Sequence, residues 1–241
     1  MKSWSFELSP RLRKVAEAIP EGMTVADIGT GHGLLPAYLV MSGKCPSVVA
    51  TERAEGPYNT TREFLDVLGL AGKVDLRMGD GLEPLAPGES DVAVIAGMGG
   101  RMIADILSRG QDVAKRMKCL ILQPSIQGEV LRMRLCPSYR IIAEELVEER
   151  GRFYEIIVVS HGGFTPVNNE ALYEIGPVLY RERHPMLARW IHHKMQGYRR
   201  VVARLDLQSS ERAKERRREL SMRLNRLHAL LLSISQTGEA K

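Results

Sequence analysis

The chain has 241 residues, 44% of them hydrophobic and 26% charged, which is the composition of a globular protein with a packed core. No apolar run is long enough to span a bilayer, and the first residues lack the apolar centre of a signal peptide, so neither export nor membrane insertion is expected. The three cysteines, Cys45, Cys119 and Cys136, are too far apart for a C-x-x-C metal or redox pair. We therefore expect a cytoplasmic, reduced protein without a metal.

The net charge of +5 is concentrated in the last third of the chain. Residues 1–165 carry 19 Lys and Arg against 21 Asp and Glu, which gives −2, whereas residues 166–241 carry 15 against 8, which gives +7. Such an excess indicates a polyanionic partner, and nucleic acid is the expected one. A solvated helical surface rich in Arg is the alternative reading of the same charge.

Helix and strand signals alternate from the start of the chain. Ser9 followed by Pro10 predicts the N-cap and first residue of a helix, in which apolar residues recur at helical spacing as far as Ile19. Strands are then predicted over 23–28, 47–51, 74–78, 91–96 and 120–123. The helices predicted between and after them span 34–41, 60–68, 101–108 and 126–135.

Two further strands, 139–147 and 153–160, flank Arg150-Gly151 and predict a hairpin. Parallel strands need crossover connections, so five strand–helix units predict a mostly parallel sheet with helices on both faces. The hairpin brings the total to seven strands. The expected fold class is therefore Rossmann-like α/β.

The pattern changes after His161-Gly162-Gly163, and we place a domain boundary between residues 1–165 and 166–241. Pro185 opens a long helix, which Ser209-Ser210 interrupts. One face of this helix carries a first apolar stripe, formed by Leu187, Ile191, Met195, Tyr198, Val202 and Leu205. A second apolar stripe follows with the 4-3-4-3 spacing of a coiled-coil seam, formed by Leu220, Leu224, Leu227, Leu231 and Ile234. Two stripes separated by a polar break predict an antiparallel helical hairpin, with a single bent helix as the alternative.

The strand over 23–28 runs directly into Asp27-Ile28-Gly29-Thr30-Gly31-His32-Gly33. Such a loop places backbone N–H groups and a helix N-terminus beside a ligand. The dinucleotide pattern requires a glycine at position 34, where this chain has Leu34. Asp27 would repel a pyrophosphate, but it suits the cationic amino group of S-adenosylmethionine. The loop therefore favours the methyl donor over a dinucleotide.

Two more acidic residues follow neighbouring strands. Glu52 ends the second strand and is placed to accept hydrogen bonds from ribose hydroxyls, while Asp80 follows the third strand and is placed to accept one from the adenine amine. Ligands bind at the carboxyl edge of such sheets, which favours a shared site over three unrelated surface acids. The predicted cofactor-binding residues are Asp27, Gly29, Gly31, His32, Glu52, Asp80, Gly81 and Gly97.

With these residues in place, the chain resembles the bacterial tRNA methyltransferases that modify N1 of adenine 22 in the D-arm region. The resemblance covers roughly residues 7–160. It is carried by Asp27-Ile28-Gly29, His32, Leu35-Pro36, Gly56-Pro57, Gly79-Asp80-Gly81, Ile95-Ala96-Gly97-Met98-Gly99-Gly100, Leu120-Ile121-Leu122-Gln123-Pro124 and Tyr154-Glu155. It implies a class I methyltransferase fold, S-adenosylmethionine as cofactor, tRNA as substrate and a C-terminal coiled-coil-like domain.

The chain departs from the family pattern within the glycine loop. Gly31 and Leu34 stand where the family commonly has Asp and Tyr, so we expect cofactor binding to be kept and no essential chemistry to depend on an Asp or Tyr side chain at these positions. N1 of adenine has a free in-plane lone pair, so methylation needs positioning and electrostatics more than a general base. That nitrogen lies on the Watson–Crick edge, and the base must leave its stack to react.

The expected catalytic residues follow from this chemistry. The run from Gly97 to Gly100 replaces the Asn/Asp-Pro-Pro-aromatic loop of many amino-methylating enzymes, and it offers backbone that a base can approach closely. Gly97, Met98 and Gly99 are accordingly predicted to be catalytic. The resemblance adds His32 to this group, with a structural histidine bonded to the loop backbone as the alternative. The predicted substrate-binding residues are Arg11, Gly100, Gln123 and Tyr154. His192-His193 is read as a solvated pair on a basic helix.

Two other functions fit parts of the sequence. One is an S-adenosylmethionine-dependent methyltransferase that acts on another RNA or on a small metabolite. The other is a non-enzymatic module that binds the cofactor and docks proteins on its helical hairpin. A monomer is expected in each case.

Overall fold

The computed structural model describes residues 6–236, with side chains as far as residue 234. The first five residues, part of the segment in which no signal peptide is expected, lie outside the described residues. The chain divides into two compact units between Pro166 and Val167, and each is taken by itself below.

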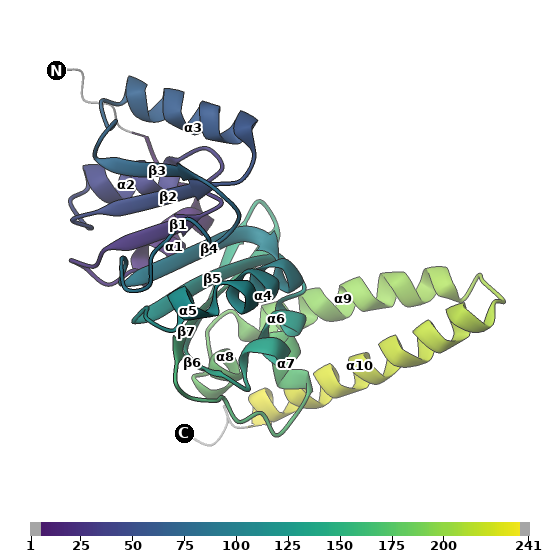
Figure 1. Ribbon diagram of the computed structural model, residues 1–241. Coiled ribbons are helices and arrows are strands. Elements are labelled where there is room, and N and C mark those ends of the chain that lie inside the picture. Colours follow the sequence, from purple (N-terminus) through teal and green to yellow (C-terminus); the bar gives the residue numbers. More distant parts are fainter. Residues whose placement is uncertain (1–5, 237–241) are drawn as a thin grey trace. The chain divides into compact units, whose positions relative to one another are not determined.

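A seven-stranded sheet forms the centre of the first unit, in the order β3-β2-β1-β4-β5-β7-β6. The first five strands are parallel, and the last two form an antiparallel hairpin at one edge. The strands are β1 (Val25–Ile28), β2 (Val48–Glu52), β3 (Val74–Met78), β4 (Val92–Gly99), β5 (Cys119–Ile126), β6 (Tyr139–Glu149) and β7 (Arg152–His161). The predicted Rossmann-like α/β class, with its mostly parallel seven-stranded sheet, is confirmed (Figure 1).

Helices cover both faces of this sheet (Figure 1). Those of the first unit are α1 (Pro10–Ala18), α2 (Leu34–Met41), α3 (Glu55–Val67), α4 (Gly100–Arg109), α5 (Gln111–Ala114) and α6 (Gly128–Leu135). Buried residues of α1 and α2, such as Val15 and Leu39, pack on Val25, Val94 and Ile121 of the central strands. Burial of such side chains supplies about 1.5–3 kcal/mol each, so this layer fixes α1 against the sheet.

Three element boundaries differ from the prediction by three residues or more. Helix α3 begins at Glu55 instead of residue 60, because Pro57 lies in the first turn, where its missing N–H has no helical partner to lose. Strand β4 continues to Gly99 and β5 to Ile126, because their mutual pairing extends past the apolar core of each strand. The hairpin turn is as predicted, with Arg150 and Gly151 both at positive φ.

The second unit is a helical hairpin preceded by two short helices. Its elements are α7 (Ala171–Ile175), α8 (Pro177–Arg181), α9 (Leu187–Leu205) and α10 (Glu211–Gln236). Helices α9 and α10 lie side by side in Figure 1 and pack along their length, so the antiparallel hairpin is confirmed and the single bent helix is wrong. Leu220 and Leu227 of the predicted seam are buried, and Leu230 joins them.

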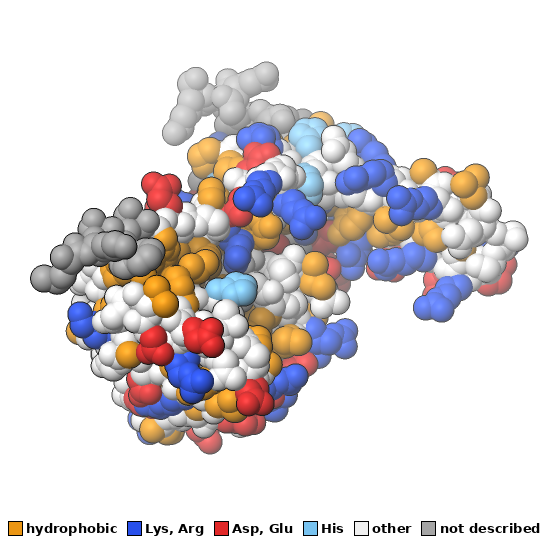
Figure 2. All heavy atoms as spheres, turned by 90° about the horizontal axis from the view of Figure 1, so that it is seen from above, with side chains coloured by type: hydrophobic (Ala, Val, Ile, Leu, Met, Phe, Trp, Pro, Cys, Tyr) orange, Lys and Arg blue, Asp and Glu red, His pale blue; other side chains and the backbone are white. Residues whose placement is uncertain are grey.

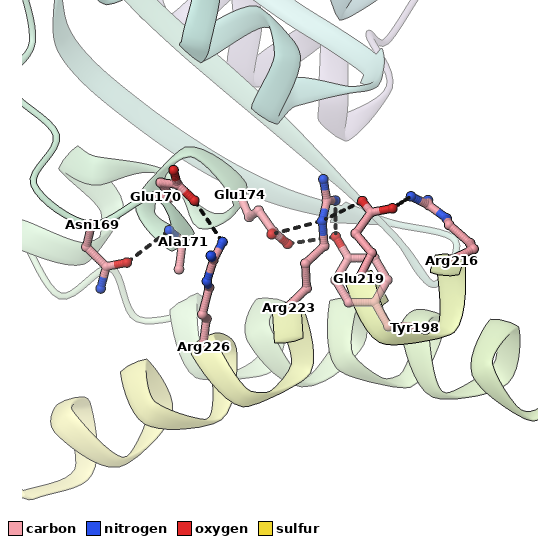
Figure 3. Close-up of polar contacts among 9 residues, drawn as sticks. All are labelled: Asn169, Glu170, Ala171, Glu174, Tyr198, Arg216, Glu219, Arg223 and Arg226. Atoms are coloured by element: carbon pink, nitrogen blue, oxygen red, sulfur yellow. Dashed lines mark hydrogen bonds and ion pairs between the residues drawn. The ribbon is translucent and has the colours of Figure 1, made fainter. Parts of the chain in front are cut away.

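A buried carboxylate ties α7 to both long helices (Figure 3). Glu174 is 6% exposed and accepts a hydrogen bond of 2.7 Å from the Tyr198 hydroxyl of α9. Its other oxygen lies 3.6 Å from Nε of Arg223 on α10. Arg226 of α10 similarly pairs with Glu170 at 2.8 Å. Within residues 6–236, no helix is both long and apolar enough to cross a membrane.

Candidate active site

Three left-handed glycines shape the loop between β1 and α2. Gly29, Gly31 and Gly33 have φ of 68°, 65° and 70°, a conformation that costs side-chain-bearing residues roughly 1–2 kcal/mol each. A Cβ on Gly29 would also overlap with the Met98 side chain. The loop therefore requires glycine for its turn, and it directs the N-terminus of α2 toward the carboxyl edge of the sheet.

Asp27 lies in β1 just before this loop and is only 5% exposed. Burial raises the pKa of its carboxyl group to about 6, nearby Glu52 adds to the rise, and the Thr30 hydroxyl opposes it. No Lys or Arg forms an ion pair with Asp27 in the part of the chain that the structure describes. The carboxylate lines a pocket of about 230 Å³, and an unpaired acid in such a place is poised to receive a cation.

The neighbouring acid, Glu52, holds the loop from the end of β2. One carboxylate oxygen accepts a hydrogen bond of 3.1 Å from the N–H of Gly31, and the other accepts bonds from the N–H groups of Arg53 and Ala54 at 2.9 and 3.3 Å. On the other side, the Thr61 hydroxyl of α3 donates to the carbonyl of Gly31 at 2.6 Å. The middle of the glycine loop is thus fixed by two elements.

Two residues that line the pocket, Arg11 and Gly97, are joined by Gln123, whose side chain is completely buried. Its Nε2 donates to the carbonyl of Pro124 at 2.8 Å, which fixes the orientation of the amide. The Oε1 atom accepts from Arg11 Nη1 at 2.6 Å and from the N–H of Gly97 at 3.2 Å. One amide oxygen therefore joins α1, β4 and β5 at the carboxyl edge.

Arg11 extends this network to the β6–β7 hairpin. Its guanidinium carbon lies 5.5 Å from the centre of the Tyr154 ring, in cation–π geometry. Its backbone N–H donates to Glu149 at 3.0 Å. A guanidinium plane, an aromatic ring and an amide offer a planar heterocycle both a stacking surface and hydrogen-bonding groups.

The family model for TrmK, tRNA (adenine(22)-N(1))-methyltransferase, matches residues 25–229. The chain belongs to this family. The tRNA (adenine(22)-N(1))-methyltransferase of Bacillus subtilis strain 168 is 35% identical over 234 residues, which cover 93% of this chain and 97% of the relative. The predicted family and the predicted class of enzyme are confirmed.

Solved structures of family members agree along almost the whole chain. The B. subtilis m1A22 tRNA methyltransferase TrmK is 33% identical, with a TM-score of 0.83 over 94% of this chain and 100% of that one. A putative tRNA (m1A22) methyltransferase of Streptococcus pneumoniae, solved in complex with S-adenosyl-L-methionine, is 32% identical, with a TM-score of 0.79 over 93% of this chain and 100% of that one. The cofactor expected from the sequence agrees with that complex.

The structure brings most of the predicted site residues of this family member to one edge of the sheet. The pocket is lined by six of them, namely Arg11, Asp27, Gly29, Gly31, His32 and Gly97. Glu52, Met98, Gln123 and Tyr154 contact that group through the interactions given above, and Gly99 ends β4 beside it.

Three predicted residues lie apart from the pocket. The Asp80 carboxylate is engaged by Arg109 at 3.1 Å and by Arg53 at 3.7 Å. Gly81 packs on α4, because a Cβ there would lie 2.9 Å from Ile106. Gly100 is needed for packing, since a Cβ on it would overlap with the carbonyl of Gln127.

Sequence reasoning missed Thr61 and Glu149, which hold the glycine loop and Arg11 in place. Thr61 is a single polar residue within a helix, and Glu149 is one of several acids before the hairpin turn, so neither carries a local signal. Size alone does not select the site either. A cavity of about 430 Å³ lies at the other end of the sheet, where β6 begins and β7 ends, and it contains none of the residues above.

Proposed function

We propose that this chain transfers a methyl group from S-adenosylmethionine to N1 of adenine 22 in tRNA, with residues 1–165 as the catalytic domain and residues 166–241 as an RNA-holding domain. The observation that carries the proposal is the buried, unpaired Asp27 beside the Arg11–Gln123–Tyr154 cluster. A site for a cation and a site for a planar base meet there at one edge of the sheet.

The residues of the glycine loop fit S-adenosylmethionine. Asp27 presents a carboxylate to the amino group of the methionine portion, and burial strengthens that attraction. Glu52 needs only to exchange one backbone hydrogen bond to receive a ribose hydroxyl. Asp80 is assigned to the adenine amine of the cofactor. To bind it, the Asp80 carboxylate would give up its hydrogen bond from Arg109. When bound, the cofactor supplies an electrophilic methyl group on a sulfonium.

On the acceptor side, the chain's task is positioning. N1 of adenine attacks with its own lone pair, so no side chain has to remove a proton first. Tyr154 and the Arg11 guanidinium provide faces on which the base can stack. Gly97 and Gly99 leave room for the base, and their carbonyls are assigned to its N6 amine. Met98, packed against Gly29, and His32 are assigned to the boundary between cofactor and base. Gly100 lies outside the pocket and is assigned to the base only through its place next to Gly99.

The helical unit is proposed to hold the tRNA backbone. Figure 2 shows Lys and Arg side chains (blue) along the hairpin at the right of the view. Several are committed to ion pairs, such as Arg217 with Asp206 at 2.7 Å and Arg226 with Glu170. Arg204, Arg212 and Arg218 are exposed and form no ion pair with any described residue. Those three are free to contact phosphates.

Arginine 11 gives the sharpest test of the acceptor site. Arg11→Gln removes the stacking cation and should lower kcat/KM for tRNA by about 100-fold, with a much smaller change in cofactor affinity. The matched control is Arg13→Gln on the same helix, since Arg13 is exposed and its one ion pair among the described residues is with Glu7, at 3.6 Å. Equal activity of the two variants would place the acceptor site elsewhere.

We propose that the protein is a monomer. Size-exclusion chromatography with light scattering tests this oligomeric state.

A further inference from the structure

Strands β4 and β5 continue as a pair beyond the rest of the sheet. Strand β1 ends at Ile28, opposite Ile95 of β4, and the pairing of β5 with β7 ends at Leu122. The two strands nevertheless stay paired through Met98 opposite Pro124 and Gly99 opposite Ile126, with irregular register around Met98. Within the described chain, no third strand flanks these last pairs. They form a two-stranded extension at the edge that carries the site.

The extension ends in an exposed apolar side chain. Ile126 is 65% exposed. Its side chain lies beside its strand partner Gly99, since a Cβ added to that glycine would be in ordinary van der Waals contact with Ile126 Cγ1, at 3.7 Å. Isolated apolar side chains are common on protein surfaces, so exposure alone carries no weight. Ile126, however, comes three residues after Gln123, the buried amide that joins Arg11 to Gly97.

The backbone of the next residue, Gln127, shows that the surrounding structure fixes the position of Ile126. Gln127 has φ 60° and ψ 38°, the left-handed region, and caps α6 without a side-chain hydrogen bond. A non-glycine residue persists there only where its surroundings impose it. Here Gly100 allows the contact, because a Cβ at that position would overlap with the Gln127 carbonyl. The close packing of the start of α4 on this loop therefore holds Ile126 at the end of the two-stranded extension.

We infer that Ile126 packs into the base stack of the tRNA, in the gap that the target adenine leaves. This inference rests on the proposed function. Extrusion of a base unstacks its neighbours, and apolar side chains that fill such gaps compensate part of the loss. An isoleucine has no charge for a phosphate and no donor or acceptor for a base edge, so a base face is the part of the RNA that it suits.

The test compares Ile126→Ala and Ile126→Gln with Val67→Ala, a β-branched residue that is 63% exposed at the far end of α3. Three quantities are measured: kcat/KM for tRNA, cofactor affinity by calorimetry, and the emission of 2-aminopurine in place of adenine 22. Both Ile126 variants should lose about tenfold in kcat/KM and most of the emission rise on binding. The Val67 variant should match the unaltered protein, and cofactor affinity and Tm should not change in any of them.

A second substrate separates gap filling from a general contact. On a tRNA in which adenine 22 faces a base that it cannot pair with, extrusion costs less, and the Ile126 variants should recover to within about threefold of the unaltered protein. Equal losses on both tRNAs, or no loss on either, would overturn the inference while leaving the proposed function intact. Failure of the unaltered protein to methylate tRNA would instead remove both.

Discussion

Replacing Asp27 with asparagine should stabilise the protein while weakening its binding of the methyl donor. The folded pKa of about 6 exceeds the ordinary 3.8, so the folded state favours the protonated carboxyl. The stability contributed by this preference is fully present below pH 3.8 and is lost as the pH rises through about 6. At neutral pH the buried carboxylate therefore opposes folding.

The magnitude follows from that difference. A rise from 3.8 to about 6 corresponds to roughly 3 kcal/mol at 1.36 kcal/mol per pKa unit. An amide is also desolvated when buried, so Asp27→Asn should regain about 1–3 kcal/mol of the free energy of unfolding. For a chain of this size the gain corresponds to a rise in Tm of roughly 2–10 °C. Most single substitutions instead lower the free energy of unfolding.

The assay is thermal unfolding without cofactor at pH 5 and pH 8, together with calorimetric titration of S-adenosylmethionine. The gain in Tm should be larger at pH 8 than at pH 5, because Asp27 is largely neutral at the lower pH. Cofactor affinity should fall by at least about 30-fold in Asp27→Asn, since the buried charge pair is lost. In the unaltered protein, affinity should weaken as the pH is lowered through about 6.

Asp91 is the matched control, because its pKa is shifted in the opposite direction. A hydrogen bond to Lys118, and others from the backbone and hydroxyl of Thr24, lower the pKa of Asp91 to about 2. The stability that it contributes is present above pH 3.8 and is lost as the pH falls through about 2. Asp91→Asn should therefore lower Tm at both pH values. A fall in Tm for both variants at pH 8 would refute the claim that Asp27 is held as an unpaired carboxylate.

Three further predictions concern other parts of the molecule. Gly29→Ala should reduce cofactor affinity by at least about tenfold, measured by calorimetry, because alanine is strained at the left-handed φ of 68°; unchanged affinity would mean that the loop adapts freely. Arg132 is fully buried between Glu144 and Glu155. Arg132→Met should lower the free energy of unfolding, measured by urea titration, by about 3–5 kcal/mol, because two buried carboxylates lose their partner. Combined alanine substitution of Arg204, Arg212 and Arg218 should weaken tRNA binding and reduce the salt slope by roughly 0.7–0.9 per lost phosphate contact, whereas Arg226→Ala should reduce it less.

The regular secondary structure and the parallel sheet were predictable from the sequence. The period of the apolar residues reveals strands and helices, and the crossover rule then assigns the parallel sheet. The start of α3 was not predicted correctly. The helix was expected from residue 60, but it begins at Glu55 and has Pro57 in its first turn. The strand ends of β4 and β5 pair through residues with no strand-like pattern, which only their spatial proximity reveals.

The candidate site was predictable to the extent that its residues follow strand ends. Asp27 and Glu52 are identified by their places near the end of β1 and at the end of β2, and both contact or line the glycine loop. Gln123 was assigned to the substrate, but its role in joining Arg11 to Gly97 depends on three elements meeting in space. Asp80 follows the same strand-end rule, yet Arg109 of α4 neutralises it. Ion pairs between distant elements have no signature in one sequence.

The most direct test of the central claim is to locate the methyl group by mass spectrometry of nuclease fragments, after incubating unmodified tRNA with the protein and S-adenosylmethionine. Two tRNAs are compared, one with adenine 22 and one with guanine at that position. We predict 1-methyladenine at position 22 of the first and no methylation of the second. A methyl group at another nucleotide, equal incorporation into both tRNAs, or transfer to small molecules alone would contradict the account.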